Sequence, residues 1–456
     1  MRSTRSRRLR SDMRLAWLLT HGADRLERRR AALTAIGAAV ATGFASVAVA
    51  LLSVRGQYSF SYGHGLLDQP GTRHGIVAGL LLLLVPVLGF LGQCARIGAV
   101  HRDRRLANLR LAGAGPKQVR RIAALEAGLA CLAGTLAGFA GFAVALPVVG
   151  WTPPGVAWPV LVAVVVLIPV LAALVSEVAL HRVIASPLGH VRRERPRHGP
   201  RPLTALFLPA LVVVLGVGAL MSRGSRAGVA GLPLFVLGAV VLTGAGAVWV
   251  AGASARAIGR RLADRTDDPA VLLAAARLQE DPWAAARSHA AIVLVSVVGV
   301  ALVGVRQVFL ADLRGIERQG RTAAPMDYYT FGLDLTAAAV LIALVISVAA
   351  VAVGTAESLS TRRRALAAQV AAGVPRRILT RALLLETALP LAPALALATL
   401  GGTAIHIAYA DVAGQAVAWA PPLLVPLAVY AVCLLAAATA LPLLRRSVRP
   451  GRLRTA

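Results

Sequence analysis

Two stretches of the chain carry basic side chains at a shared spacing around a helix break. The first runs from Arg105 to Ala127 and reads RLANLRLAGAGPKQVRRIAALEA; a looser copy runs from Ala365 to Ala388 and reads ALAAQVAAGVPRRILTRALLLETA. Each has a basic helix, a Gly/Pro break and a second basic helix that ends in Leu-Glu. Clustered arginines hold anionic lipid headgroups or dock against a protein. Lipid attraction needs no fixed spacing, so the repetition favours docking against a shaped protein surface.

The residue pattern predicts how each copy folds. Leu106 and Leu109 recur at helical spacing among arginines, which predicts a short amphipathic helix. Gly113 suits a left-handed cap at the end of this helix, and Pro116 suits the first turn of the next one. The second copy breaks in the same way at residues 373–375.

The helix that restarts after the first break has two features that predict burial. Glu126 falls near the inner boundary of the membrane, where a carboxylate should face protein or water rather than lipid. Gly134 and Gly138 form a Gly-x-x-x-Gly pattern, which permits the close approach of another helix. We interpret this pattern as packing.

The sequence offers no support for catalysis or for a cofactor. It has no His-Glu-x-x-His pattern and no paired cysteines, so no metal site is expected. A phosphate-binding P-loop needs Gly-Lys-Ser/Thr, but the one lysine, Lys117, stands in Pro-Lys-Gln. His406 is the one histidine deep in an apolar run, toward its outer end, where a satisfied or snorkelling histidine is a simpler interpretation than a proton relay. We predict a protein that is not an enzyme and does not bind ATP through a P-loop.

The composition places these elements in a membrane protein. Of the 456 residues 57% are hydrophobic, and the net charge is +29. In a soluble chain this charge would indicate nucleic acid, but here the basic residues lie in short clusters between apolar runs, so no nucleic-acid partner is expected. A span needs about 20 apolar residues. Ten runs qualify: 31–54, 76–95, 123–149, 157–180, 203–221, 231–253, 289–309, 332–354, 382–407 and 419–444.

The distribution of positive charge predicts the orientation of these ten spans. With the N-terminus inside, the inner loops and tails hold 41 of the 49 Lys and Arg residues, and the outer side holds 8. Because short loops rich in Lys and Arg stay in the cytoplasm, both termini are expected there. The protein itself is expected in the cell membrane. The outer stretches 55–75 and 310–331 are only about 20 residues each, too short for a folded outer domain.

An ungapped alignment at an offset of 260 residues relates the two copies. It matches Arg102 with Arg362, Gly113 with Gly373, and Leu125-Glu126 with Leu385-Glu386. Spans 1–4 and 7–10 are therefore interpreted as two parallel repeats, which two linking spans keep in the same orientation. The predicted fold is an all-α polytopic membrane protein of ten helices, with a first repeat at 1–202, a linker hairpin at 203–253 and a second repeat at 254–456.

The stretch LRLAGAGPKQVRRIAALEA resembles the signature of the FtsX-like permease family, the membrane subunits of ABC systems of the MacB and lipoprotein-releasing type. The matching positions are Leu109, Arg110, Gly113, Ala114, Gln118, Val119, Leu125 and Glu126. The second copy keeps Gly373, Leu385 and Glu386 but has Gln369-Val370 in place of Leu-Arg. The stretch LAAARLQEDPWAAAR, from Leu273 to Arg287, is similar to the family's amphipathic helix before the first span of a repeat.

This resemblance implies a permease that contacts two copies of a separate ABC ATP-binding subunit, besides the lipid bilayer. ATP hydrolysed there would serve to export, extract or sense a hydrophobic or amphipathic molecule at the outer leaflet. A secondary transporter and a non-transporting regulator driven by the same motion are the alternatives. The residues expected to couple the permease to the ATPase are Arg105, Leu106, Leu109, Arg110, Gly113, Pro116, Gln118, Val119, Arg121, Glu126, Leu366, Gly373, Pro375, Arg377, Arg381 and Glu386.

Overall fold

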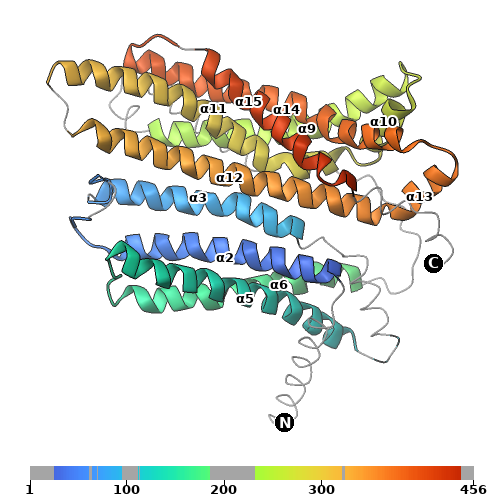
Figure 1. Ribbon diagram of the computed structural model, residues 1–456, viewed down its shortest axis with the longest axis horizontal. Helices are drawn as coiled ribbons and strands as arrows, with labels where there is room; N and C mark the ends of the chain where they lie inside the picture. The colour runs from blue at the N-terminus through green and yellow to red at the C-terminus, as the bar shows by residue number, and fades with distance from the viewer. Residues whose placement is uncertain are drawn as a thin grey trace. The chain divides into compact units, whose positions relative to one another are not determined.

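The computed structural model describes residues 25–60, 64–68, 70–94, 111, 113, 115–184, 232–320, 324–417 and 419–442. These residues form helices and connecting loops, and the described part contains no strand (Figure 1). The chain divides into two compact units, residues 1–193 and residues 194–456. Each unit is described by itself below.

The first unit is a bundle of four long helices. α2 packs against each of the other three, and α5 also packs against α6. Their bounds are α2 (Arg25–Ser53), α3 (Pro70–Cys94), α5 (Pro116–Val149) and α6 (Ala157–Ile184).

The second unit is a larger bundle with two short helices at one end. α11 packs against α9, α12, α14 and α15, while the short α10 lies against α9 and α14. Figure 1 shows α10 and α13 at the same end of the long helices. The bounds are α9 (Leu232–Ala263), α10 (Pro269–Glu280), α11 (Pro282–Arg318), α12 (Met326–Thr361), α13 (Arg363–Ala371), α14 (Arg376–Ala413) and α15 (Ala420–Ala438).

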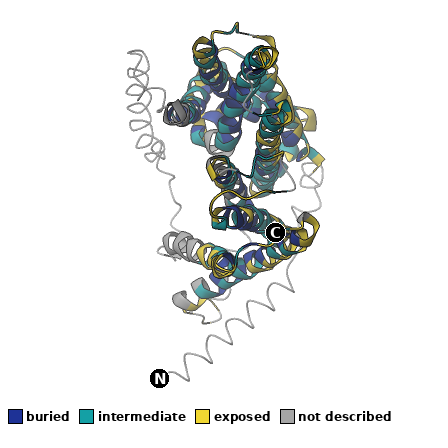
Figure 2. Ribbon diagram, turned by 90° about the vertical axis from the view of Figure 1, so that its left-hand side faces the viewer, coloured by how far each residue is buried: buried dark blue, intermediate teal, exposed yellow. Residues whose placement is uncertain are grey.

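The long helices have the length and the surface of membrane spans. Figure 2 shows exposed residues on the outer faces of the helices and buried ones between them. Large aliphatic side chains are among the exposed ones: Val162 on α6, Val345 on α12 and Leu427 on α15 are 55%, 67% and 67% exposed. Such faces suit contact with lipid. Within the described residues, seven helices are long and apolar enough to cross a membrane, namely α2, α5, α9, α11, α12, α14 and α15.

These observations confirm the predicted all-helical, polytopic membrane protein. Helices lie over nine of the ten predicted spans, and the predicted fifth span at 203–221 falls outside the described residues. The total of ten spans and the three-part domain division stay predictions.

The stretch 310–331, which the sequence places in an outer loop, is mostly helical in the structure. α11 continues to Arg318 and α12 begins at Met326, so most of this stretch is helical. The apolar window used to place spans detects only the part of a helix that lipid can cover. The polar continuation, including residues 311–318, keeps helix-forming side chains and the backbone hydrogen bonds of α11.

The Gly-x-x-x-Gly pattern of the first unit packs directly on another helix. A Cβ atom on Gly134 would lie 2.1 Å from the carbonyl oxygen of Ala35, and one on Gly138 would lie 2.3 Å from that of Ala39. The packing interpretation is therefore confirmed, and the helix in contact is α2. In the second unit, Ala394 and Ala398 on α14 are fully buried in the main apolar cluster with residues of α9 and α11.

Candidate functional site

The break in each basic element has the backbone conformation that its glycine predicts. Gly113 has φ +95 and Gly373 has φ +92, and the two glycines are the aligned pair of the sequence repeat. At the second break Val374 N donates to Gln369 O over 3.0 Å, and Gly373 N donates to Val370 O over 3.0 Å. This is the hydrogen-bond pattern of a Schellman cap, which satisfies the last carbonyls of α13.

The short helix α13 has one buried face and one exposed face. Leu366 is 5% exposed and lies in an apolar cluster with Leu359 of α12 and Leu379 of α14, against which Val370 and Val374 also pack. Its alanines Ala365, Ala368 and Ala371 are exposed. The cluster fixes α13 on the ends of α12 and α14 and leaves a flat alanine surface open.

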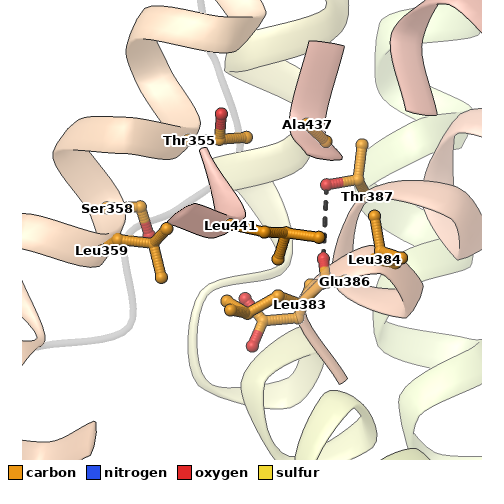
Figure 3. Close-up of a pocket in the computed structure, with 9 residues that line it drawn as sticks. All are labelled: Thr355, Ser358, Leu359, Leu383, Leu384, Glu386, Thr387, Ala437 and Leu441. Carbon is orange, nitrogen blue, oxygen red and sulfur yellow. Dashed lines mark hydrogen bonds between the residues drawn. The ribbon is translucent and has the colours of Figure 1, made fainter. Parts of the chain in front are cut away.

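A pair of opposite charges ties the beginning of α13 to α14. Arg362 Nη1 donates to Glu386 Oε2 over 2.9 Å, and both side chains are largely buried. Arg277 of α10 also lies close enough to Glu386 to interact with it electrostatically. Figure 3 shows Glu386 beside a pocket of about 50 Å³ between α12, α14 and the residues around the end of α15. The pocket is lined by Thr355, Ser358, Leu359, Leu383, Leu384, Glu386, Thr387, Ala437 and Leu441.

A second ion pair fastens α14 to α10. Arg381 Nη1 lies 2.7 Å from Asp268 Oδ2, while Asp268 Oδ1 accepts a hydrogen bond from Ala270 N over 2.8 Å and so caps α10. Gln279 at the other end of α10 donates to the carbonyl of Gly259 in α9 over 2.9 Å. α10 thus joins the base of α14 to α9.

The glutamate of the first copy also binds an arginine. Glu126 Oε1 lies 2.6 Å from Arg30 Nη2, and Glu126 is 6% exposed. The expectation that this carboxylate faces protein is confirmed. Gln118 is exposed, and Arg121 is half-buried and has interaction partners.

The predicted coupling residues differ in where the structure places them. Pro375 and Arg377 are exposed and are available to a second protein, whereas Leu366 and the two glutamates contact the chain itself, and Arg381 is exposed but pairs with Asp268. The backbone of Pro116 and Val119 lies at the start of α5. Outside the described residues lie Arg105, Leu106, Leu109 and Arg110.

Sequence reasoning missed the partners of the charged residues. Arg30 and Asp268 come from elements far from the repeat in sequence, and the stretch Leu273–Arg287, which contains Arg277, gave no indication that it lies near Glu386. One signal was present: Asp268 stands immediately before Pro269, an arrangement that is typical of a helix start. The described residues contain no group of three or more His, Cys, Asp or Glu side chains that could hold a metal ion.

The fold and the site together define a class of protein: a multi-pass membrane protein whose second unit carries a short helix, exposed on one face, at one end of its long helices. Residues 337–447 match the family model described as FtsX-like permease C-terminal, a range that includes α13, α14 and α15. Over these residues the match supports the resemblance to the FtsX-like permease family, and it suggests an ABC transporter permease-type membrane subunit. Members are generally not catalytic themselves and usually work with an ATP-binding subunit. The comparison with curated proteins gives no match.

Proposed function

We propose that the chain is the permease subunit of an ABC system, driven by ATP that two copies of a separate subunit hydrolyse. The observation that carries the proposal is the surface of α13, which lies within the FtsX-like match and is held rigidly on one side while its alanine face stays open. A flat row of small side chains lets a second protein approach the helix backbone closely. Arg376 and Arg377, exposed beside it, favour a partner with acidic residues around its groove.

The contacts of α13 support a mechanical role. A force on its exposed face would reach α12 and α14 through the cluster around Leu366 and through the Arg362–Glu386 pair. From α14 it would reach α10 through Arg381–Asp268, and then α9 through Gln279. Since these links join four helices of one unit, the partner's motion would be transmitted as a common displacement rather than absorbed locally.

The packing of the described helices supports two four-span repeats with two linking spans. In the first unit α2 packs on α3, α5 and α6, and α5 packs on α6. The corresponding contacts of α11 with α12, α14 and α15, and of α14 with α15, occur in the second unit. We infer a cell-membrane protein with ten spans and with both termini in the cytoplasm, an orientation that places both basic elements where an ATPase can bind them.

Co-purification tests this function. The tagged full-length chain is expected to retain an ABC ATP-binding subunit and to stimulate its ATP hydrolysis after reconstitution in liposomes. Ala368→Asp on the exposed face of α13, and Leu109→Asp with Gly113→Asp in the first element, should abolish stimulation while membrane insertion is unchanged. Ala416→Asp, an exposed alanine near the opposite end of α14, is the matched control and should keep full stimulation.

Two results would contradict the proposal. One is ATP hydrolysis by the purified chain alone. The other is normal co-purification and turnover of the Ala368→Asp complex. Solute uptake coupled to an ion gradient, without ATP, would instead favour a secondary transporter.

A further inference from the structure

The loop between α2 and α3 folds around one arginine. The hydrogen bonds that hold its described residues include Tyr58 N to Asp68 O at 3.3 Å, Asp68 N to Gly65 O at 3.1 Å, Phe60 N to Asp68 Oδ1 at 2.9 Å, and Thr72 Oγ1 to Leu66 O at 2.6 Å. Phe60 also packs against Tyr58 and Trp151 with tilted rings, whose centroids lie 4.8 and 5.5 Å from its own. These contacts fix residues 58, 60 and 64–68 of the loop on the first unit.

Arg73, in the first turns of α3, is 2% exposed. Its Nη2 donates to the carbonyl oxygen of Gly56, but its Nη1 is buried and has no hydrogen-bond partner. Among the described residues it forms no ion pair. A buried charge without a counter-charge is costly, so the guanidinium needs an anion that the described residues do not supply.

The surroundings of Arg73 strengthen the positive potential. It lies at the N-terminal end of a 25-residue helix, where the helix dipole favours negative charge, and the first turn of α3 contains no acidic residue. Arg55 and His74 are exposed nearby in the sequence. Residues 54–75 contain two arginines and two histidines but one carboxylate, Asp68. Helix dipole and buried guanidinium thus favour the same kind of ligand.

We propose that Arg73 is the recognition residue of an anion-binding site at this end of the first unit, which takes a single phosphate or carboxylate group. The planar guanidinium suits such a group because two of its N–H donors can bind two oxygens together. Leu52 on α2 and Leu81 on α3 are about half exposed and offer an apolar surface for the rest of an amphipathic molecule. If the proposed permease function holds, the site faces the outer leaflet and recognises the headgroup of the molecule that the permease handles.

Lipid retention on the full-length chain in detergent, measured by native mass spectrometry, tests the site. Phosphatidylglycerol and phosphatidylcholine with identical acyl chains are the probes, and inorganic phosphate is the competitor. The chain should prefer phosphatidylglycerol, and Arg73→Gln should weaken its retention by about tenfold or more, the effect of losing a charge-assisted hydrogen bond. Arg55→Gln and His74→Gln, which change exposed neighbours, should alter it less than about twofold.

The competitor distinguishes the source of the anion. Release of phosphatidylglycerol by millimolar phosphate would support a site open to free anions, while retention in phosphate would support a lipid headgroup. Equal retention by the native chain and Arg73→Gln would overturn the proposal. An equally large loss in Arg55→Gln would also overturn it, because diffuse surface charge would then explain the binding.

Two further measurements test the site even if Arg73→Gln does not fold. Arg73→Lys keeps the charge but loses the fork of donors, and it should bind phosphatidylglycerol with intermediate strength. The native chain should also unfold at a higher temperature with phosphatidylglycerol than with phosphatidylcholine; equal stability in the two lipids would overturn the site. These assays contain no ATPase, so their failure leaves the proposed permease function standing, and failed ATPase coupling leaves the anion site standing.

Discussion

Glu386 of α14 accepts a hydrogen bond from Arg362, which stands in the turn between α12 and α13. The aligned glutamate of the first copy, Glu126, pairs instead with Arg30 near the beginning of α2. Both copies therefore neutralise the carboxylate at the base of a long helix, but with an arginine from a different element. In the second copy the pair fixes the start of α13, so a movement of α13 must displace the base of α14.

Replacing Arg362 with Gln should loosen α13 and weaken coupling. Because the pair is largely buried, leaving Glu386 without its partner should destabilise the second unit by about 1–3 kcal/mol. Thermal unfolding in detergent measures the loss, and the rate of partner ATP hydrolysis measures the coupling. The exchange Arg362→Glu with Glu386→Arg should recover part of both. A double variant no better than the single one would show that pairing is not what matters at these positions.

Gly134 and Gly138 should tolerate no side chain. Alanine at either position would place its Cβ within 2.1–2.3 Å of a carbonyl oxygen of α2, which forces the two helices apart. We expect Gly134→Ala and Gly138→Ala each to lower the stability of the first unit by about 1–3 kcal/mol, the range for overpacking. Gly141→Ala is the control, because nothing lies within 4 Å of its Cβ position. The same destabilisation in all three variants would mean that the backbone contact with α2 is not the cause.

The helices themselves were predictable because lipid imposes a simple requirement. A run of about 20 apolar residues must form a helix to satisfy its backbone in a bilayer, and helices were found over nine predicted spans. The polar extension of α11 to Arg318 was not predictable in this way. Once a helix leaves the lipid, its length depends on backbone hydrogen bonding and on neighbouring helices, which hydropathy does not report.

Some features of the candidate site likewise follow from local sequence, and others depend on how the helices pack. The left-handed conformation of Gly373 follows from local sequence, since a glycine after a helix and before a proline has few alternatives. The burial of Leu366 and the pairing of Arg381 with Asp268 depend on which helices meet in space. Arginines that look equivalent in the sequence therefore have different surroundings. Arg362 pairs with Glu386 of the same chain, while Arg377 is exposed.

The cap at Gly373 provides a test of how rigid the element must be. Alanine there would meet no atom within 4 Å, but it would have to adopt φ +92, a conformation that costs an L-residue about 1–2 kcal/mol. Gly373→Ala should therefore reduce ATPase coupling with little loss of partner binding. Gly115→Ala, at φ −66 and also in open space, is the matched control. Equal coupling in the two variants would show that the left-handed cap is dispensable.

Topology is the last prediction, because both the coupling surface and the anion site depend on which ends of the helices face the cytoplasm. Cysteines at Ser59 and Ala416 should react with a membrane-impermeant thiol reagent in intact cells, while cysteines at Gly115 and Ala372 should react only after lysis. All four positions are exposed, and none has a positive φ. The native thiols Cys94, Cys131 and Cys433 are buried, so a chain without added cysteines gives the background.

The expected pattern follows from the charge distribution, since loops with clustered Lys and Arg are retained inside. Gly224 on the outer side and Gly199 on the inner side flank the predicted fifth span and extend the map over the linking spans, and Thr322 adds an outer position between the predicted seventh and eighth spans. Labelling of Gly115 or Ala372 from outside would place α13 away from any cytoplasmic ATPase. The permease proposal would then fail, whereas anion binding at Arg73 would still be tested by lipid retention in detergent, which does not depend on topology.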